Sequence, residues 1–189
     1  MTPPLVAVFG SGSAPAADLN RARDLGYALG RAGYGVINGG YGGTMEASAE
    51  GARAADAPVI GVTCALFRSF RTGPNPHASE VVEAPTLYAR LETLIERAAA
   101  YVVMPGGVGT MIELALTWEH LRRGLVTERP LVVWEEPWRE VVRVLEAGPY
   151  AETGHELLTW VGSVDEAVAA IRARVPIDMA EHARDDQRG

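Results

Sequence analysis

The sequence predicts an α/β protein with one doubly wound, mostly parallel sheet and helices on both faces. Three observations lead to this prediction. The 189 residues are 48% apolar, which suits one domain with a single hydrophobic core. Short apolar runs alternate with helical patterns, and a glycine-rich turn follows three of the runs. Because right-handed crossovers join alternating strands and helices, the strands become parallel and the helices cover both faces.

Each expected strand is a short, mostly apolar run bounded by polar or turn residues. The expected strands are Leu5–Phe9, Gly35–Asn38, Val59–Thr63, Tyr101–Met104, Leu131–Trp134 and Leu157–Val161. The expected helices are Ala17–Ala32, Thr44–Ala54, Thr86–Ala99, Met111–Arg122, Trp138–Glu146 and Val164–Ala173. Residues 1–175 are therefore expected to form one Rossmann-like domain, with its ligand site at the carboxyl ends of the strands.

Two parts of the chain fit this alternation less well. The stretch from Phe67 to Pro85 contains Gly73 and three prolines, and it is long for a loop in a compact domain. It forms either an active-site lid or a surface connection with a short strand near Val81 and Val82, and the sequence favours neither. Residues 176–189 are polar and charged, so we expect a disordered tail.

Composition argues against several classes of protein. All 17 basic residues are arginines, so the chain has no lysine for a pyridoxal phosphate Schiff base or a Walker A loop. A net charge of −7 argues against binding nucleic acid. The apolar runs are far shorter than the roughly 20 residues of a membrane helix. Met1–Pro4 lacks the charged start of a signal peptide, so we expect a cytoplasmic protein without a membrane partner.

Metal and thiol chemistry have little support. The histidines are scattered, at His77, His120, His155 and His182. His155-Glu156 lacks the second histidine of a zinc-protease helix. Cys64 has no second cysteine to pair with, and its place at the end of an apolar run predicts an inert buried thiol. We expect neither a metal nor a cofactor.

Three glycine-rich turns connect predicted strands to predicted helices. They are Gly10-Ser11-Gly12-Ser13, Gly39-Gly40-Tyr41-Gly42-Gly43-Thr44-Met45 and Pro105-Gly106-Gly107-Val108-Gly109-Thr110-Met111. Glycine lets the backbone approach a phosphate closely, so that N–H groups and the helix dipole face the anion. Tight strand-to-helix packing could explain one such turn, whereas three at one end of a sheet favour a ligand. The expected phosphate- or nucleotide-binding residues are Gly10, Ser11, Gly12, Gly39, Gly40, Gly42, Gly43, Gly106, Gly107, Val108, Gly109 and Thr110.

The first turn differs from a dinucleotide-binding fingerprint. Pro15 stands where the third glycine of that fingerprint belongs. The second strand ends in Asn38 rather than in the acidic residue that binds the ribose of NAD. Both differences argue against a dehydrogenase.

Glu113 admits two roles. Thr110 and Glu113, three residues apart, match a capping box at the start of a helix. The same carboxylate would lie at the positive end of that helix, where it would stay ionised and face a ligand. Arg90, at the start of the preceding helix, could hold a phosphate, a ribose or a carboxylate. However, an arginine at a helix end is usually solvated, and spacing alone does not single out Arg90.

The segment Pro105-Gly106-Gly107-x-Gly109-Thr110-x-x-Glu113 resembles the signature of the LOG (Lonely Guy) family, cytokinin riboside 5'-monophosphate phosphoribohydrolases. The resemblance covers nearly the whole chain. It implies that the signature holds a nucleotide phosphate. It also implies that Glu113 and Arg90, fifteen residues before Pro105, are catalytic and cleave the base from ribose 5-phosphate. A homodimer or larger homo-oligomer, with the site near the subunit interface, is implied as well.

The implied activity is hydrolysis of the N-glycosidic bond of AMP or an N6-modified AMP, as in cytokinin activation. Leu91 and Ile112 depart from the family pattern, which has lysine after the arginine and a second glutamate. The second glycine-rich turn resembles a bacterial branch rather than the plant-like pattern. Related folds use the same turns without chemistry, so a carrier or sensor of a nucleotide or a molybdopterin-type cofactor stays open as the alternative.

Overall fold

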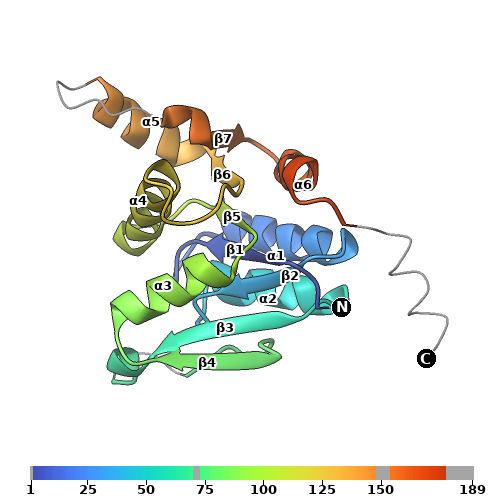
Figure 1. Ribbon diagram of the computed structural model, residues 1–189. Helices are drawn as coiled ribbons and strands as arrows, with labels where there is room; N and C mark the ends of the chain where they lie inside the picture. Colours follow the sequence, from blue (N-terminus) through green and yellow to red (C-terminus); the bar gives the residue numbers. More distant parts are fainter. Residues whose placement is uncertain (1, 70–72, 148–153, 178–189) are drawn as a thin grey trace.

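The computed structural model describes residues 2–69, 73–147 and 154–177 of the chain (Figure 1). Within them, seven parallel strands form one sheet in the order β4-β3-β2-β1-β5-β6-β7. The strands are β1 (Leu5–Phe9), β2 (Gly35–Asn38), β3 (Val59–Cys64), β4 (Glu80–Ala84), β5 (Ala100–Val103), β6 (Leu131–Trp134) and β7 (Leu158–Val161). The helices are α1 (Ala16–Arg31), α2 (Thr44–Ala54), α3 (Leu87–Arg97), α4 (Val108–Arg122), α5 (Glu135–Glu146) and α6 (Val164–Arg174), with short 3-10 turns η1 (Ala65–Phe67) and η2 (His155–Leu157). The predicted fold class is confirmed.

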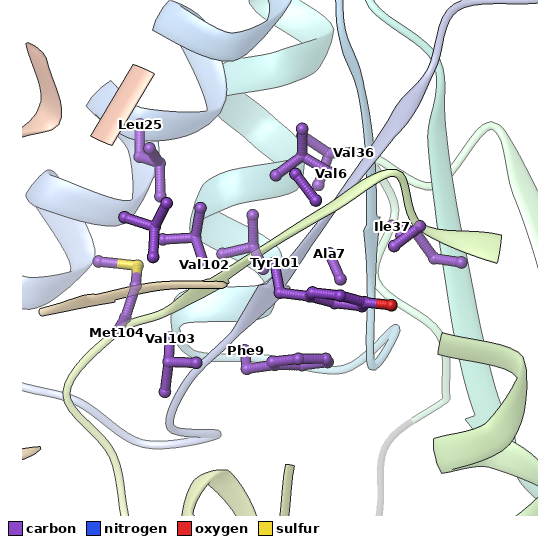
Figure 2. Packing of buried hydrophobic residues seen from close by; sticks show 14 of the residues in the cluster. Val6, Ala7, Phe9, Leu25, Val36, Ile37, Tyr101, Val102, Val103 and Met104 are labelled. Atoms are coloured by element: carbon purple, nitrogen blue, oxygen red, sulfur yellow. The ribbon is translucent and has the colours of Figure 1, made fainter. Parts of the chain in front are cut away.

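Helices cover both faces of this sheet. On one face α1 packs against α2 and α6, whereas α3 and α4 lie on the opposite face (Figure 1). Strands β1, β2, β3, β5 and β6 are buried at every position, as expected for parallel strands covered on both sides. Figure 2 shows the Phe9 ring stacked on the Tyr101 ring between β1 and β5, with the ring centroids 6.3 Å apart.

The strand order reverses beside β1. The chain runs from β1 to β2 and β3 on one side, and after β4 it returns to β5, β6 and β7 on the other. In such sheets the ligand crevice lies outside the carboxyl ends of the strands at the reversal. The first glycine-rich turn follows β1 and the third follows β5, so both flank this point.

Strand β4 was expected only as an alternative, near Val81 and Val82. It pairs in parallel with β3, from Ile60 opposite Glu80 to Cys64 opposite Ala84. Because β4 is an edge strand with mostly exposed side chains, it lacks the apolar run that marks a buried strand. The Phe67 to Pro85 stretch thus starts at the last residue of η1 and contains strand β4. Its residues 70–72 lie outside the described residues, and a lid role stays a prediction.

The first two residues of the predicted tail, 176 and 177, lie among the described residues. Ile177 packs against the core, with its Cγ2 3.1 Å from the Cβ position of Gly33. Residues 178–189, the rest of that tail, lie outside the described residues. In the part of the chain that is described, no helix is both long and apolar enough to cross a membrane.

Gly51→Ala is expected to destabilise the fold by about 2 kcal/mol, because α1 and α2 pack closely through this glycine. A Cβ at Gly51 would overlap the carbonyl oxygen of Arg23 in α1. The matched control is Gly109→Ala in α4, where, beyond the adjacent residues and the helix's own backbone, no atom of the described residues lies within 4 Å of the added Cβ. That change should raise stability by up to about 1 kcal/mol. Urea denaturation measures both effects, and equal midpoints would contradict the close packing of α1 on α2.

Candidate active site

The first two glycine-rich turns form one unit at the carboxyl ends of β1 and β2. Thr44, the first residue of α2, donates its backbone N–H and its hydroxyl to the carbonyl oxygen of Ser11, at 2.9 and 3.0 Å. Gly43 permits this contact, because its φ is 72° and a Cβ there would collide with the same oxygen. Gly10 leaves room for the Thr44 hydroxyl. Gly10 and Gly43 therefore have structural reasons to be glycine, and their contact with a phosphate stays a prediction.

Asn38 braces the second turn from within. This side chain is 0% exposed at the end of β2. Its Oδ1 accepts the N–H of Gly40 at 2.9 Å. Its Nδ2 donates to the carbonyl of Met45 at 2.8 Å and to the hydroxyl of Ser48 at 3.2 Å. In the sequence analysis, Asn38 served only as an argument against a dinucleotide site. A polar residue at the end of an apolar strand was the signal that could have indicated its bracing role.

The third turn enters its helix earlier than predicted. Helix α4 begins at Val108 with Gly107 as its N-cap, not at Met111. Thr110 therefore lies inside the first turn, 3% exposed, with its side chain over Gly106. The predicted capping box is wrong, because the N-cap is a glycine and, among the described residues, no side chain caps this helix. The low helix propensity of glycine concealed this start in the sequence.

Gly107 and Gly109 have open space beside them. Gly107 has a φ of −99° and Gly109 is helical. Beyond the adjacent residues and the helix's own backbone, no atom of the described residues lies within 4 Å of a Cβ built at either position. Gly106 differs, because a Cβ there would collide with the side chain of Thr110. Packing therefore does not require glycine at 107 and 109. Bare backbone with unpaired N–H groups at a helix start is what an anion site needs.

Gly109→Ala is expected to keep the protein folded and to weaken AMP binding by at least about tenfold, because the methyl group would occupy the open space beside α4. Gly106→Ala is the contrasting variant, which should lower the melting temperature through its clash with Thr110. Calorimetric titration with AMP and thermal denaturation separate the two effects. Unchanged AMP affinity in Gly109→Ala would put the ligand elsewhere.

Arg90 is buried, although its position at a helix end suggested a solvated side chain. It is only 6% exposed. Its Nε donates to the carbonyl of Val62 at 2.7 Å, and its Nη2 donates to the carbonyl of Gly39 at 3.0 Å. A buried guanidinium needs such partners. These bonds tie α3 to the carboxyl ends of β3 and β2, and Nη1 lies 3.8 Å from Oε1 of Glu113.

Glu113 faces Arg90 from the second turn of α4. It is 8% exposed, and burial raises its pKa to about 7, against the opposing effect of the Arg90 guanidinium. We expected this carboxylate to stay ionised, but burial outweighs the nearby cation and the helix end. Protonated and ionised forms therefore coexist near neutral pH. A carboxyl group that titrates there can act as an acid or a base.

Two aromatic rings frame the guanidinium of Arg90. Its Cζ lies 5.7 Å from the ring centroid of Tyr41, in the second turn, and 6.0 Å from that of Phe67, in η1. The Tyr41 hydroxyl accepts the N–H of Cys64 at 2.8 Å and donates to its carbonyl at 3.3 Å. Cys64 is buried, as predicted. Neither aromatic ring was singled out from the sequence, because both roles depend on the place of Arg90.

Fold and site together define a Rossmann-like α/β protein with a buried arginine–glutamate pair beside a glycine-rich helix start. Residues 45–172 match the protein family described as possible lysine decarboxylase. The chain belongs to this family, the LOG family, as its signature predicted. The description names a decarboxylase, but the chain has no lysine to bind pyridoxal phosphate.

Two relatives of this chain are named as a phosphoribohydrolase and a nucleosidase. The cytokinin riboside 5'-monophosphate phosphoribohydrolase of Mycobacterium tuberculosis is 29% identical over 174 residues, which are 87% of this chain and 91% of that protein. A pyrimidine/purine nucleotide 5'-monophosphate nucleosidase of Escherichia coli is 32% identical over 119 residues, 59% of this chain but only 26% of that protein. Among solved structures, the molybdenum cofactor carrier protein of Chlamydomonas reinhardtii has a TM-score of 0.74 at 21% identity, covering 93% of this chain and 99% of that one. These names support a hydrolase family, and the last likeness shows the fold alone.

Proposed function

We propose that this protein is a nucleoside 5'-monophosphate phosphoribohydrolase that splits AMP or an N6-modified AMP into the free base and ribose 5-phosphate. The observation that carries this proposal is the buried Arg90–Glu113 pair, with Nη1 3.8 Å from Oε1, beside the third glycine-rich turn. A carboxyl with a pKa of about 7 next to a fixed guanidinium suits bond cleavage better than simple binding. The names of the relatives support the same class of reaction.

In this proposal the 5'-phosphate binds at the first turn of α4. The backbone N–H groups from Gly107 onwards and the positive end of the helix would face its charge, and Gly107 and Gly109 leave the space open. The phosphate is remote from the bond that breaks. Its binding energy would therefore orient the ribose against Arg90 and Glu113.

Hydrolysis replaces the bond between C1' and the base nitrogen with a bond from C1' to a water oxygen. Positive charge develops on the ribose ring as the base departs. The ionised Glu113 would stabilise that charge and accept a proton from the attacking water, and that proton would pass on to the departing base, which regenerates the carboxylate. Arg90 would position the ribose or the departing base.

Activity is expected to rise with pH through about 7, because the ionised form of Glu113 is the working form. Burial raises its pKa to about 7. Below that value, kcat/KM for AMP should fall about tenfold per pH unit. Binding of ribose 5-phosphate over the same range corrects for titration of the phosphate itself, at about pH 6. An acid limb near 4.5, the ordinary glutamate value, would mean that the buried Glu113 is not the working group.

A second candidate function is a carrier or sensor of a nucleotide or a molybdopterin-type cofactor. The observation that favours it is the similarity in fold to the molybdenum cofactor carrier, at a TM-score of 0.74. Against it, a pure binder gains nothing from a buried carboxyl group near a bound phosphate, since the two repel each other when ionised.

The protein is proposed to act as a homodimer or a larger homo-oligomer joined through α4 and α5. A groove of about 510 Å³ between these helices has apolar walls apart from Glu140. Its lining residues are Met111, Ile112, Leu114, Ala115, Trp118, Glu140, Val141, Val142, Val144 and Leu145. Ile112 is 40% and Leu145 60% exposed, and the same face of a second copy would cover them. Light scattering on the parent and on Ile112→Glu tests this, and a monomeric parent would overturn it.

The decisive experiment measures base release from a panel of nucleoside 5'-monophosphates, including AMP and its isopentenyl analogue, with the unphosphorylated nucleosides as controls. Release that requires the phosphate is the expected result, and the panel then identifies the preferred base. Tight nucleotide binding without release would favour the carrier or sensor instead. Neither binding nor release would reject both candidates.

A further inference from the structure

One hydrogen bond from α5 reaches the backbone at the base of the third glycine-rich turn. The indole Nε1 of Trp138 donates to the carbonyl oxygen of Met104 at 2.8 Å. Met104 directly follows β5, and its own N–H donates to the carbonyl of Phe9 at 2.9 Å. Trp138 and Met104 are buried, at 2% and 0% exposed. The bond therefore forms in the interior, where a carbonyl without a donor is costly.

The residue after Met104 makes the hydrogen bond from Trp138 important for the third glycine-rich turn. Pro105 has no backbone N–H, so the peptide unit between Met104 and Pro105 has one hydrogen-bonding group, the Met104 carbonyl. Trp138 engages that group. The indole thereby fixes the rotation of the peptide plane from which Gly106 and Gly107 continue into α4. A carbonyl held in this way cannot turn its negative end toward a bound anion.

We propose that Trp138 is a positioning residue for the phosphate site, acting on the third glycine-rich turn through the Met104 carbonyl without touching the ligand. This inference rests on the proposed function, which puts the 5'-phosphate at the first turn of α4. It assigns α5 a role that no sequence pattern indicated, since Trp138 was expected only as the first residue of a helix. The consequence is specific, because loss of the indole N–H should weaken binding of the phosphate and not of the nucleoside.

The test compares Trp138→Phe with Tyr34→Phe in the full-length protein. Tyr34 is also a buried aromatic donor to a backbone carbonyl, that of Val175, but it lies at the amino end of β2, away from the turns. Both variants should lower the melting temperature. Only Trp138→Phe should raise the Kd for ribose 5-phosphate, by about five- to tenfold, with the Kd for adenosine unchanged and KM for AMP affected more than kcat.

A second measurement on the parent protein covers the case in which Trp138→Phe does not fold. Hydrogen exchange of the Trp138 indole N–H, followed by NMR, should slow on addition of ribose 5-phosphate, because coupling between two sites is reciprocal. Equal Kd values for ribose 5-phosphate in parent and Trp138→Phe would overturn the inference while the proposed function stands. An indole exchange rate that stays unchanged on addition of ribose 5-phosphate would also overturn the inference. A parent that binds neither AMP nor ribose 5-phosphate would overturn the proposed function, and this inference with it.

Discussion

Glu113→Gln is expected to lower kcat for AMP hydrolysis by at least about 10³-fold while changing the Kd for AMP by less than about threefold. Glutamine keeps the volume of the side chain, so the interior between α4 and Arg90 should stay packed. It can neither carry the negative charge that stabilises the ribose cation nor accept a proton from water. Initial rates with AMP and calorimetric titration of the inactive variant measure the two quantities.

The matched control is Glu119→Gln on the same helix. Glu119 is partly exposed and pairs with Arg122 and Arg123, so the variant should keep the activity of the parent. Full activity in Glu113→Gln would falsify the catalytic assignment. Because α4 has a glycine N-cap, a capping role could not then explain the glutamate either.

Glu113→Gln should also stabilise the fold above neutral pH. Burial raises the pKa of Glu113 from 4.5 to about 7, so between these values the folded protein holds a proton that the unfolded chain has released. Stability is then lost as the pH rises through this range. Glutamine does not titrate, so the variant should gain on the order of 3 kcal/mol at about pH 8 and little at about pH 4. Chemical denaturation at both pH values checks this.

Arg90→Met is expected to lower kcat/KM for AMP by at least about 10²-fold and to destabilise the fold by about 3 kcal/mol. Methionine fills much of the same space, but the carbonyls of Val62 and Gly39 lose their buried donors. Glu113 loses the cation that lowers its pKa. The pKa of Glu113 should therefore rise further, and the remaining activity should shift to higher pH.

Arg90→Lys separates charge from geometry. An ammonium group keeps the positive charge, but it cannot repeat the planar fork that serves two carbonyls and faces Glu113 at once. Its activity should lie between those of the parent and Arg90→Met. If Arg90→Met keeps the parent's kcat/KM, the arginine serves packing alone, and the buried pair cannot carry the proposed reaction.

Much of the fold followed from local patterns. All six predicted strands are present in the structure, and their ends lie within one residue of the predicted ends. The prediction worked because a strand buried on both faces needs a continuous apolar run. Glycine-rich turns marked the carboxyl edge, since few other residues let a backbone turn so tightly into a helix. Strand β4 was the exception, because an edge strand needs no such run.

The glycine-rich turns indicated a ligand site from the sequence alone, but the pairing of Arg90 with Glu113 could be found only through the family signature. Local sequence patterns predicted a solvated Arg90 at a helix end and allowed Glu113 a capping role. The structure instead buries both side chains, with Nη1 of Arg90 3.8 Å from Oε1 of Glu113. Tyr41 and Phe67 carried no signal of their own, because each contacts Arg90, a residue distant in the chain.

The sequence by itself determined the order of the helices and of every strand but β4, the place of the glycine-rich turns and the absence of lysine chemistry. Only the tertiary structure decided that α4 starts at Val108, that α3 delivers Arg90 to β2 and β3, and that Glu113 has a pKa of about 7. The physical reason is that hydrophobic periodicity is a local property of the chain. Burial and charge interactions depend on which distant segments exclude water together.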